Sequence, residues 1–314
     1  MSRPSICVCV ATYNQCQYIE VCLRSILDQH VDAELEVLVG DDASTDGTSD
    51  IVERLATEYG GRLRHHRRSE NVGALANMRD LLGRAHADFV ARVDGDDYWL
   101  PGKLSRQLEY LRVNAECSAV YTNGIVVGRD GSLIGLFNDV GDESFNLAAM
   151  LRRGNYLNNS SVLFRGQQVA GWTVVPEQID YQVHLWLARY GWLGHIGSPL
   201  VAYRVGSHGS MVSSSGDLVR ELYWQAIQSV SRDLVSDADY AHGIADFLRR
   251  IFFRSVRTRD FGLFRAWAAR IYPASPYGYC RTTSLVAINI VRMGLKIAIG
   301  QLRPKGYRHV LYRR

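Results

Sequence analysis

The strongest constraint on the fold is an alternation of short apolar runs with amphipathic segments over the first 125 residues. The apolar or β-branched runs predict buried strands at 6–11, 35–40, 63–66, 89–93 and 119–121. The segments between them have the apolar spacing of helices and predict helices at 18–27, 48–59, 74–84 and 101–113. Strands that alternate with helices of this length indicate an α/β protein with a doubly wound, mostly parallel sheet flanked by helices. The ligand site of such a sheet lies at the C-terminal ends of its strands.

The chain changes character after residue 125. Up to residue 205 the pattern is mixed and predicts one hairpin, two helices and two strands, at 125–137, 145–152 and 180–190, and 161–164 and 200–203. A loop rich in glycine and serine follows at 206–216, and after it we predict helices at 217–235, 238–257, 260–271 and 284–301. We therefore expect a first domain at 1–205 and a helical C-terminal extension at 206–314.

The net charge of +4 conceals an asymmetry. Residues 249–314 contain fifteen Lys and Arg residues and one acid, Asp260, whereas the rest of the chain contains 21 basic and 31 acidic residues. This distribution predicts a local anionic partner for the tail and no nucleic-acid partner. Six cysteines without a paired C-x-x-C motif, and a start without a long apolar run, predict a reduced, cytoplasmic protein.

The acids Asp94-Gly95-Asp96-Asp97 directly follow the predicted strand at 89–93. Carboxylates this close repel one another, and a divalent cation between them and an anionic ligand relieves the repulsion. This arrangement suits Mg²⁺ or Mn²⁺ bound by carboxylates and by the phosphates of a substrate. The alternative is an acidic turn that caps the helix beginning near Pro101.

Two further polar clusters follow predicted strands. Asp41-Asp42 opens a turn in which Asp46 is a candidate helix cap. The Asp42 carboxylate is then free to accept a hydrogen bond from a base or a sugar. The segment Thr12-Tyr13-Asn14 follows the first strand. Three such clusters at one sheet edge suit a nucleotide diphosphate held through a metal. The glycine patterns of dinucleotide-binding and P-loop sites are absent from the sequence.

Four segments carry a family resemblance, at 6–29, 35–48, 70–111 and 179–205. They read ICVCVATYNQCQYIEVCLRSILDQ, LEVLVGDDASTDGT, ENVGALANMRDLLGRAHADFVARVDGDDYWLPGKLSRQLEYL and IDYQVHLWLARYGWLGHIGSPLVAYRV. Their order and spacing over about 5–205 resemble the family 2 glycosyltransferases of the GT-A fold. The resemblance implies an inverting enzyme that uses a nucleotide-diphosphate sugar with Mn²⁺ or Mg²⁺. It also implies a nucleotide-binding half at about 1–125 and an acceptor half at about 126–205.

The resemblance extends to the residues of the nucleoside site. The first block implies that Ala11, Thr12, Tyr13 and Asn14 line the nucleoside, with the Tyr13 ring against the base. In the second block, Asp42 rather than its neighbour Asp41 matches the acid that accepts from the base imide.

The third block contributes further donor-binding residues. Asn71 and Gly73 match its N-x-G motif. Asp94, Gly95 and Asp96 match the D-x-D motif, with Asp96 as the metal ligand and Asp94 near the ribose or the metal. Many members have Ala-Arg-Asn near 77–79 where this chain has Asn77-Met78-Arg79. An arginine contact to the diphosphate therefore stays open, with Arg79 as the nearest candidate.

The last block implies the catalytic base. Asp180 matches the acid that begins its helix and takes the proton of the acceptor hydroxyl. The alternative for Asp180 is a helix N-cap, and Glu177 is the second choice for the base. His208, after the Y-R-V segment, is a candidate third metal or diphosphate ligand or a solvated loop residue. Tyr98 and Trp99 are expected to pack in the core, with contact to the sugar as the alternative.

The sequence as a whole predicts a non-processive glycosyltransferase that moves one sugar, most readily from a UDP-sugar, to a lipid-linked or surface-polysaccharide acceptor. The alternatives are a polyprenyl-phosphate sugar transferase and a non-catalytic nucleotide-sugar-binding or scaffold protein.

The basic tail also carries aromatic residues, and this combination favours an anionic membrane surface as its partner. A contact with the body of the protein or with a second copy in a homodimer is the alternative. The apolar segment 284–300 contains Asn289, Arg292 and Lys296, and we expect a core or interfacial helix rather than a membrane span. We accordingly expect a cytoplasmic protein that is peripheral on the inner face of the plasma membrane.

Overall fold

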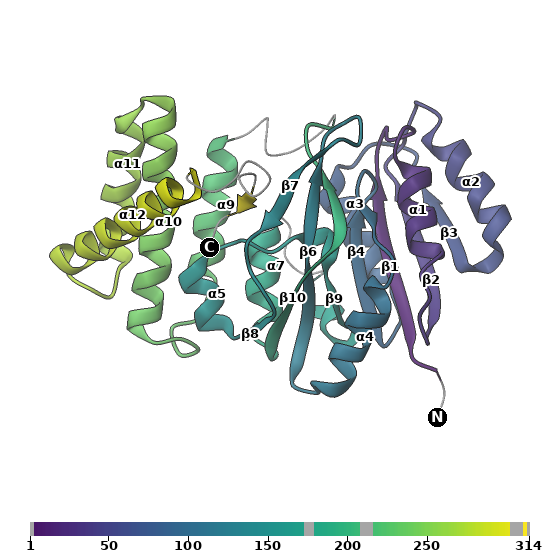
Figure 1. Ribbon diagram of the computed structural model, residues 1–314, viewed down its shortest axis with the longest axis horizontal. Coiled ribbons are helices and arrows are strands. Elements are labelled where there is room, and N and C mark those ends of the chain that lie inside the picture. Colours follow the sequence, from purple (N-terminus) through teal and green to yellow (C-terminus); the bar gives the residue numbers. More distant parts are fainter. Residues whose placement is uncertain (1–2, 173–178, 208–215, 302–309, 313–314) are drawn as a thin grey trace.

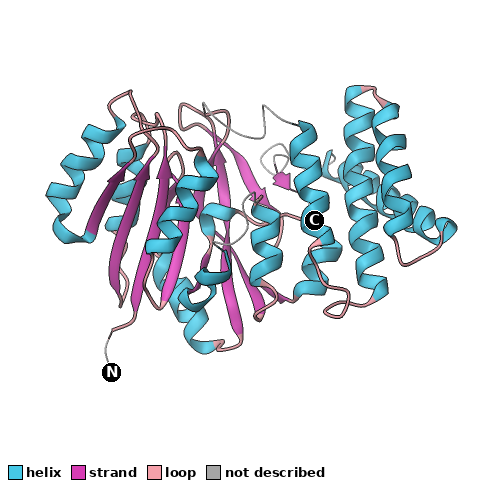
Figure 2. Ribbon diagram, turned by 180° about the vertical axis from the view of Figure 1, so that it is seen from behind, coloured by secondary structure: helices cyan, strands magenta, loops and turns pink. Residues whose placement is uncertain are grey.

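The computed structural model describes residues 3–172, 179–207, 216–301 and 310–312. The strands of these residues join into one sheet, which helices cover on both faces, and a group of further helices stands at one end (Figure 1, Figure 2). The parallel part of the sheet has the order β3-β2-β1-β4. Its strands are β1 (Ser5–Thr12), β2 (Glu34–Asp41), β3 (Leu63–Arg67) and β4 (Phe89–Asp94).

The other half of the sheet is mixed. Beyond β4, the antiparallel strand β9 (Leu163–Arg165) pairs with both β4 and the long strand β6 (Cys117–Val127). Strand β10 (Trp192–Arg204) runs parallel to β6, and β7 (Leu133–Asn138) runs antiparallel to it. Three short strands complete the edges, β5 (Tyr98–Trp99), β8 (Glu143–Phe145) and β11 (Val310–Tyr312). The predicted α/β sheet, mostly parallel and flanked by helices, is confirmed.

Strand β1 shows why its sequence is continuously apolar. Ile6, Val8 and Val10 are buried against the helices of one face, whereas Cys7 and Cys9 are buried against the other face. The first face is covered by α1 (Ile19–Leu27), α2 (Thr48–Tyr59) and α4 (Lys103–Val113), and the second by α3 (Ala74–Arg84). A strand buried on both faces loses the apolar–polar alternation of a half-exposed strand.

The C-terminal helices extend the core of the second face. This core runs from α3 through α5 (Leu147–Arg153) and α7 (Asp180–Leu187) into the extension. The helices of the extension, within the described residues, are α9 (Gly216–Gln228), α10 (Asp237–Thr258), α11 (Phe261–Ile271) and α12 (Tyr279–Gln301). Helix α10 packs on α5, α11 and α12 (Figure 1). The short helix α6 (Val169–Trp172) and four 3₁₀ turns, at 60–62, 159–161, 166–168 and 272–274, join the larger elements.

Several predicted boundaries were wrong. The strand predicted at 200–203 is the end of β10, because bulges around Pro199 let one strand continue through residues typical of a break. Helix α12 begins at Tyr279, five residues before its predicted start, and α9 ends at Gln228 rather than at 235. Strand β11 was not predicted, and it pairs in parallel with β7. Most of the loop predicted at 206–216 lies outside the described residues.

Candidate active site

The register of the sheet brings the three polar clusters to one edge. Thr12, at the end of β1, lies beside Asp41 of β2, and Ala11 lies beside Asp94 of β4. Because these strands are parallel, the loops that follow them leave the sheet at the same edge. The three loops expected to bind the donor therefore begin side by side at one edge of the sheet, as their positions after strands predict.

The loop after β1 is fastened to the loop after β2. Asn14 has a positive φ of 50°, and its amide donates to Ser44 Oγ at 2.9 Å. The Asn14 Oδ1 atom in turn accepts from the Thr45 amide at 2.8 Å. Thr12 is buried and donates to Gln15 Oε1 at 2.9 Å, whereas Tyr13 is exposed. The Tyr13 ring is thus accessible to a ligand, and Asn14 shapes the loop that carries it.

The neighbours Asp41 and Asp42 have different surroundings. The buried Asp41 carboxylate accepts from the Ser44 amide at 2.9 Å and from the Ser49 hydroxyl. Burial raises the pKa of Asp41, but hydrogen bonds from His65, Ser44 and Ser49 outweigh burial and hold it below its ordinary value. These contacts occupy the Asp41 carboxylate inside its own loop, which suits a structural role.

Asp42 joins the second block to the third. Its two carboxylate oxygens accept from the backbone amides of Val72 and Gly73 at 2.9 and 2.8 Å. The Asn71 side chain accepts from the same Gly73 amide at 3.1 Å. The structure therefore brings Asp42, Asn71 and Gly73 together. Asp42 is buried, and each of its oxygens accepts one of these amides, so its contact with a base stays a prediction.

The D-x-D loop packs tightly against the loop after β1. The Gly95 amide donates to the Ala11 carbonyl at 2.9 Å. A Cβ at Gly95 would lie 2.5 Å from Gln15 Oε1 and 3.0 Å from the Thr12 side chain, so only glycine fits without displacing them. Asp94 is half exposed, and Arg92 of the same strand lies 3.7 Å from its carboxylate. The capping alternative for this turn is wrong, because α4 begins at Lys103 with Gly102 as its N-cap.

Arg204, at the end of β10, holds the acidic loop in place. Its amide donates to Asp97 Oδ1 at 2.8 Å, and its Nε donates to the Asp96 carbonyl at 3.0 Å. Its Nη1 reaches the carbonyl of Gly128 at 2.7 Å, and the guanidinium lies 4.3 Å from the centre of the Tyr18 ring. Arg204 was not among the predicted site residues. The Y-R-V segment of the last block was the only signal for it.

The acids of this loop have raised pKa values. Burial, and then the charge of Asp94, raises the pKa of Asp96, while Ser207 and Arg204 lower it in part. Burial and the charges of Asp96 and Asp94 raise the pKa of Asp97 well above its ordinary value. Such a group of carboxylates is stabilised by a bound cation.

Asp180 is the first residue of α7. Ile179 is the N-cap, so the capping interpretation of Asp180 is wrong. The Asp180 carboxylate instead accepts from the Asn159 side chain. Its side chain is accessible to solvent, yet surrounding protein raises its pKa by desolvation. The charge of Asp94 raises this pKa further and that of Arg92 lowers it, so Asp180 lies within electrostatic reach of the acidic loop.

Sequence reasoning missed the turn that connects Asp180 with the acidic loop. Asn159 holds Asp180, and the next residue, Ser160, accepts the Asp94 amide through its hydroxyl at 3.3 Å. The Ser160 carbonyl accepts from Trp99 Nε1 at 2.9 Å, and Trp99 is buried, as its packing interpretation predicts. The only sequence signal was a run of small polar residues directly before an apolar strand.

Metal ligation rests on few side chains. Asp94 and Asp96 supply carboxylate oxygens, which are the hard donors that Mg²⁺ and Mn²⁺ prefer. Within residues 3–172, 179–207, 216–301 and 310–312, no group of three or more His, Cys, Asp or Glu side chains is arranged to hold a metal ion. His208, the candidate third ligand, and Glu177, the second choice for the base, lie outside the described residues.

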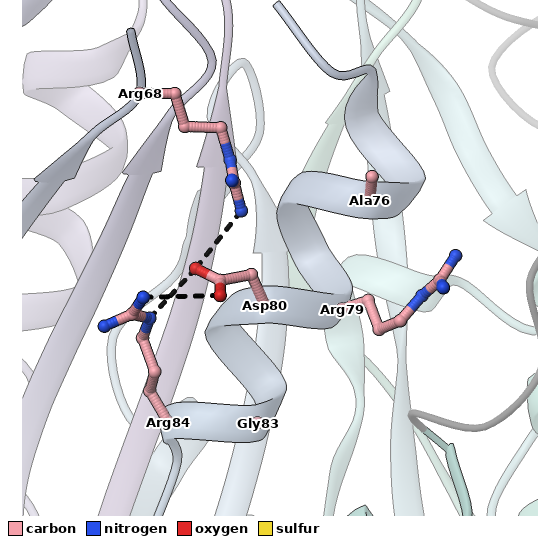
Figure 3. Close-up of a pocket in the computed structure, with 6 residues that line it drawn as sticks. All are labelled: Arg68, Ala76, Arg79, Asp80, Gly83 and Arg84. Atoms are coloured by element: carbon pink, nitrogen blue, oxygen red, sulfur yellow. Dashed lines mark hydrogen bonds and ion pairs between the residues drawn. The ribbon is translucent and has the colours of Figure 1, made fainter. Parts of the chain in front are cut away.

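A pocket of about 510 Å³ lies beside α3, and residues of α3 and Arg68 line it (Figure 3). Asp80 at its centre binds Arg84 at 2.9 Å and Arg68 at 3.1 Å. Arg68 also donates to Asn77 Oδ1 at 3.1 Å. Arg79 points away from the Asp80 carboxylate (Figure 3). The cations around Asp80 are thus paired inside the protein, and a diphosphate contact by Arg79 stays a prediction.

Comparison with known proteins agrees with this geometry. The sequence model of glycosyl transferase family 2 matches residues 7–158. The putative teichuronic acid biosynthesis glycosyltransferase TuaG of Bacillus subtilis is 33% identical over 135 residues, which are 43% of this chain and 52% of TuaG.

Two solved structures share the fold. TarS 1–349 of S. aureus, in complex with UDP-GlcNAc, superposes with a TM-score of 0.58 at 17% identity, over 87% of this chain and 93% of that structure. The mannosyltransferase PcManGT of Pyrobaculum calidifontis, in complex with GDP-Man and Mn²⁺, superposes with a TM-score of 0.58 at 20% identity, over 98% and 83% of the two chains.

The sheet, with acidic loops at its C-terminal edge, has the GT-A fold, and the match to the family model and to TuaG identifies a glycosyltransferase. Residues 7–158 of this chain belong to glycosyltransferase family 2.

Proposed function

We propose that the enzyme moves a single sugar from a nucleotide-diphosphate sugar to a saccharide acceptor, with inversion at the anomeric carbon and without processive elongation. The acceptor is lipid-linked or part of a surface polysaccharide. The observation that carries this proposal is the turn at 159–160, where Asn159 donates to the Asp180 carboxylate and the Ser160 hydroxyl accepts from the Asp94 amide at 3.3 Å. A base and a donor-binding acid near one point are what a direct displacement requires.

The donor-binding surface consists of the loops after β1, β2 and β4. Ala11, Thr12, Tyr13 and Asn14 line the nucleoside, and Asp42 accepts from its base beside Asn71 and Gly73. Asp94, Gly95 and Asp96 face the diphosphate. UDP is the nucleotide we propose, with support from the UDP-GlcNAc complex of TarS, and GDP is the competitor that PcManGT suggests.

Mn²⁺ or Mg²⁺ fits the donor set of this site. Asp96 and Asp94 would hold it together with phosphate oxygens. Burial and the neighbouring charge of Asp94 raise the pKa of Asp96, and a bound cation would offset both effects. The bound ion would supply positive charge to the departing diphosphate. PcManGT, which shares the fold, was solved with Mn²⁺. His208 is proposed as a further ligand.

Asp180 is the base that we propose. Its ionised carboxylate takes the proton of an acceptor hydroxyl while the oxygen of that hydroxyl attacks the anomeric carbon. The bond from this carbon to the diphosphate oxygen breaks, and the diphosphate leaves with the electron pair. Asn159 orients the carboxylate, and the charge of Arg92 favours its ionised form.

The domain division and the cellular location belong to the same proposal. Residues 1–205 form the catalytic domain, and residues 206–314 form a helical extension that brings it to its acceptor. The basic region 249–314 places the enzyme at the cytoplasmic face of an anionic membrane. A homodimer through this region is the competing arrangement.

The test is transfer and donor binding by the full chain. We expect Asp180→Asn to bind UDP-sugar with wild-type affinity and to lose about 10²–10⁴-fold in transfer rate, the scale of general base removal. We expect Asp96→Asn to lose Mn²⁺-dependent UDP binding in calorimetric titration and to keep its fold. Asp50→Asn, an exposed acid in the first turn of α2, is the matched control and should keep wild-type activity.

The outcomes separate the alternatives. Near-wild-type transfer by Asp180→Asn would move the base to Glu177. Wild-type UDP binding by Asp96→Asn would refute the metal site. Transfer to polyprenyl phosphate in place of saccharides would favour the polyprenyl-phosphate sugar transferase. Binding without any donor hydrolysis or transfer would favour the non-catalytic binding protein.

A further inference from the structure

Helix α12 crosses the outer side of the helical extension (Figure 1). One of its sides packs on α10, where Thr282 and Val286 are buried and Ile290 is partly buried. Most of the remaining surface of the helix is exposed. The helix is thus anchored along one side and free along the other.

The free side of α12 carries a row of large aliphatic residues. The members of the row are each between 46% and 60% exposed, and they are Ile288, Val291, Leu295 and Ile299. They are spaced three or four residues apart, so they lie along one side of the helix. An exposed aliphatic row of this kind marks an interaction surface more often than a solvated one.

Cations flank this row without any acid. Arg281, Arg292 and Lys296 are exposed, and α12 contains no Asp or Glu between Tyr279 and Gln301. At the start of the helix Tyr279 is exposed, and the Arg281 guanidinium lies 4.4 Å from the centre of the Tyr277 ring. Apolar residues bordered by cations and tyrosines complement the boundary between acyl chains and anionic headgroups.

Some of the cations of the tail at 249–314 form ion pairs within the protein. Arg249 and Arg250 both bind Asp246, at 2.6 and 2.8 Å, and Arg270 binds Glu221 at 2.5 Å. These three cations are engaged inside the protein. Other cations of the tail, such as Arg254 and Arg257, are exposed, but α12 combines its cations with the exposed aliphatic row and is the better candidate for contact with lipid.

The helix is better suited to lie in the membrane plane than to cross the membrane. Tyr279–Ile299 is long and apolar enough to span, with a mean hydropathy of 1.4. However, Arg292 and Lys296 would then enter the hydrocarbon, where each charge costs about 2.5–3.5 kcal/mol near the centre. Crossing would also remove Val286 from its buried place against the helical extension.

We propose that α12 is an in-plane helix that docks the enzyme on an anionic lipid bilayer. Its aliphatic row enters the acyl boundary, and its cations bind headgroup phosphates. This inference rests on the membrane partner proposed above and assigns that partner to one surface. The residues of the contact are Arg281, Ile288, Val291, Arg292, Leu295, Lys296 and Ile299.

The experiment is co-sedimentation of the full chain with vesicles of equimolar phosphatidylglycerol and phosphatidylcholine. We expect wild type to bind these vesicles and to bind pure phosphatidylcholine more weakly. Val291→Glu/Leu295→Glu should lose binding at low and high salt, because the substitutions place two carboxylates in the row that would otherwise enter the acyl boundary. The control Val113→Glu changes a residue that is 75% exposed on α4, and it should bind as wild type does.

The cations are tested separately. Arg292→Gln/Lys296→Gln should lower the partition coefficient on the anionic vesicles about 30-fold, since each cation near such a surface contributes about 1 kcal/mol. The effect should shrink at high salt. Thermal unfolding midpoints of all variants are compared with wild type to verify folding.

Four results would overturn the proposal. These are absence of wild-type binding to the anionic vesicles, undiminished binding by Val291→Glu/Leu295→Glu, and protein that only detergent releases from the vesicles. The fourth is a wild-type dimer that the two Glu substitutions dissociate, because a second copy would then cover the row. Donor hydrolysis in solution should be equal in wild type and Val291→Glu/Leu295→Glu, so failure of the docking surface is distinguishable from failure of the proposed catalytic function.

Discussion

Replacing Arg204 by methionine tests the architecture of the donor site most directly. The Arg204 guanidinium donates to the carbonyls of Asp96, Gly128 and Arg129 at 3.0, 2.7 and 3.2 Å. The last two contacts share Nη1, so we count two independent hydrogen bonds. Hydrogen bonds that involve a charged group contribute about 1.5–3 kcal/mol each, so their loss should lower the free energy of unfolding by about 3–6 kcal/mol.

The same substitution should also weaken binding of the donor. The charge of Arg204 lowers the pKa of Asp96. Without it this pKa rises, and the ionised carboxylate that a metal requires forms only at higher pH. We therefore expect Arg204→Met to bind UDP with Mn²⁺ more weakly than wild type at neutral pH, and to recover part of the affinity as pH increases. Urea unfolding and calorimetric titration measure the two effects.

Arg165→Met is the matched control. Arg165 also donates to three carbonyls, those of Cys117, Leu111 and Asn114, but it pairs with the start of β4 rather than with its end. This variant should lose stability and keep its affinity for UDP. If Arg204→Met unfolds at the wild-type urea concentration, or binds UDP as well as Arg165→Met does, the assigned role of Arg204 is wrong.

Three further predictions concern single side chains. Gly95→Ala should lower UDP–Mn²⁺ affinity by about 10-fold or more, since the new Cβ would displace Gln15; unchanged affinity in titration would show that the loop has room. Asn159→Ala should reduce kcat by about 10- to 100-fold with an unchanged donor Kd. The Asn159 hydrogen bond lowers the pKa of Asp180 in wild type, so its removal should raise this pKa and move the acid limb of the pH–rate profile to higher pH. An acid limb that does not move would contradict this role. Burial lowers the pKa of Lys103 well below its ordinary value. Between the pKa of Lys103 in the folded protein and its pKa in the unfolded chain, only the unfolded chain holds the proton. The free energy of unfolding of wild type relative to Lys103→Met should therefore rise with pH, by up to about 1.4 kcal/mol per pH unit. A difference between the two proteins in urea unfolding that stays constant from pH 7 to 10 would refute this.

Much of the fold follows from local sequence. The strands β1 to β4 and the helices between them were predicted within a few residues, because a strand buried on both faces is continuously apolar and an amphipathic helix repeats its apolar residues every three or four positions. Strand β10 was predicted only in part. Gly194, Gly197 and Pro199 weaken the local strand signal, and pairing with β6 and β8 overrides it.

The sequence likewise predicted some features of the candidate site and left others to the tertiary structure. The acids at strand ends were found from sequence because a parallel sheet gathers its strand C-termini at one edge. Which of two adjacent acids faces a ligand was a matter of family resemblance. The structure gives the two buried carboxylates different partners, Ser44 and Ser49 for Asp41 and the amides of Val72 and Gly73 for Asp42, and the contact of Asp42 with a base stays a prediction.

By itself, the sequence determined the elements, their alternation and the carboxylates placed at the strand ends, because these depend on periodicity and on neighbours along the chain. Only the tertiary structure decided the contacts that order those carboxylates. Arg204 reaches Asp97 across 107 residues, and Asn159 reaches Asp180 from a different element. It also decided that α12 turns an aliphatic row to the outside. Such contacts arise from the packing of distant segments, and no local pattern of residues encodes them.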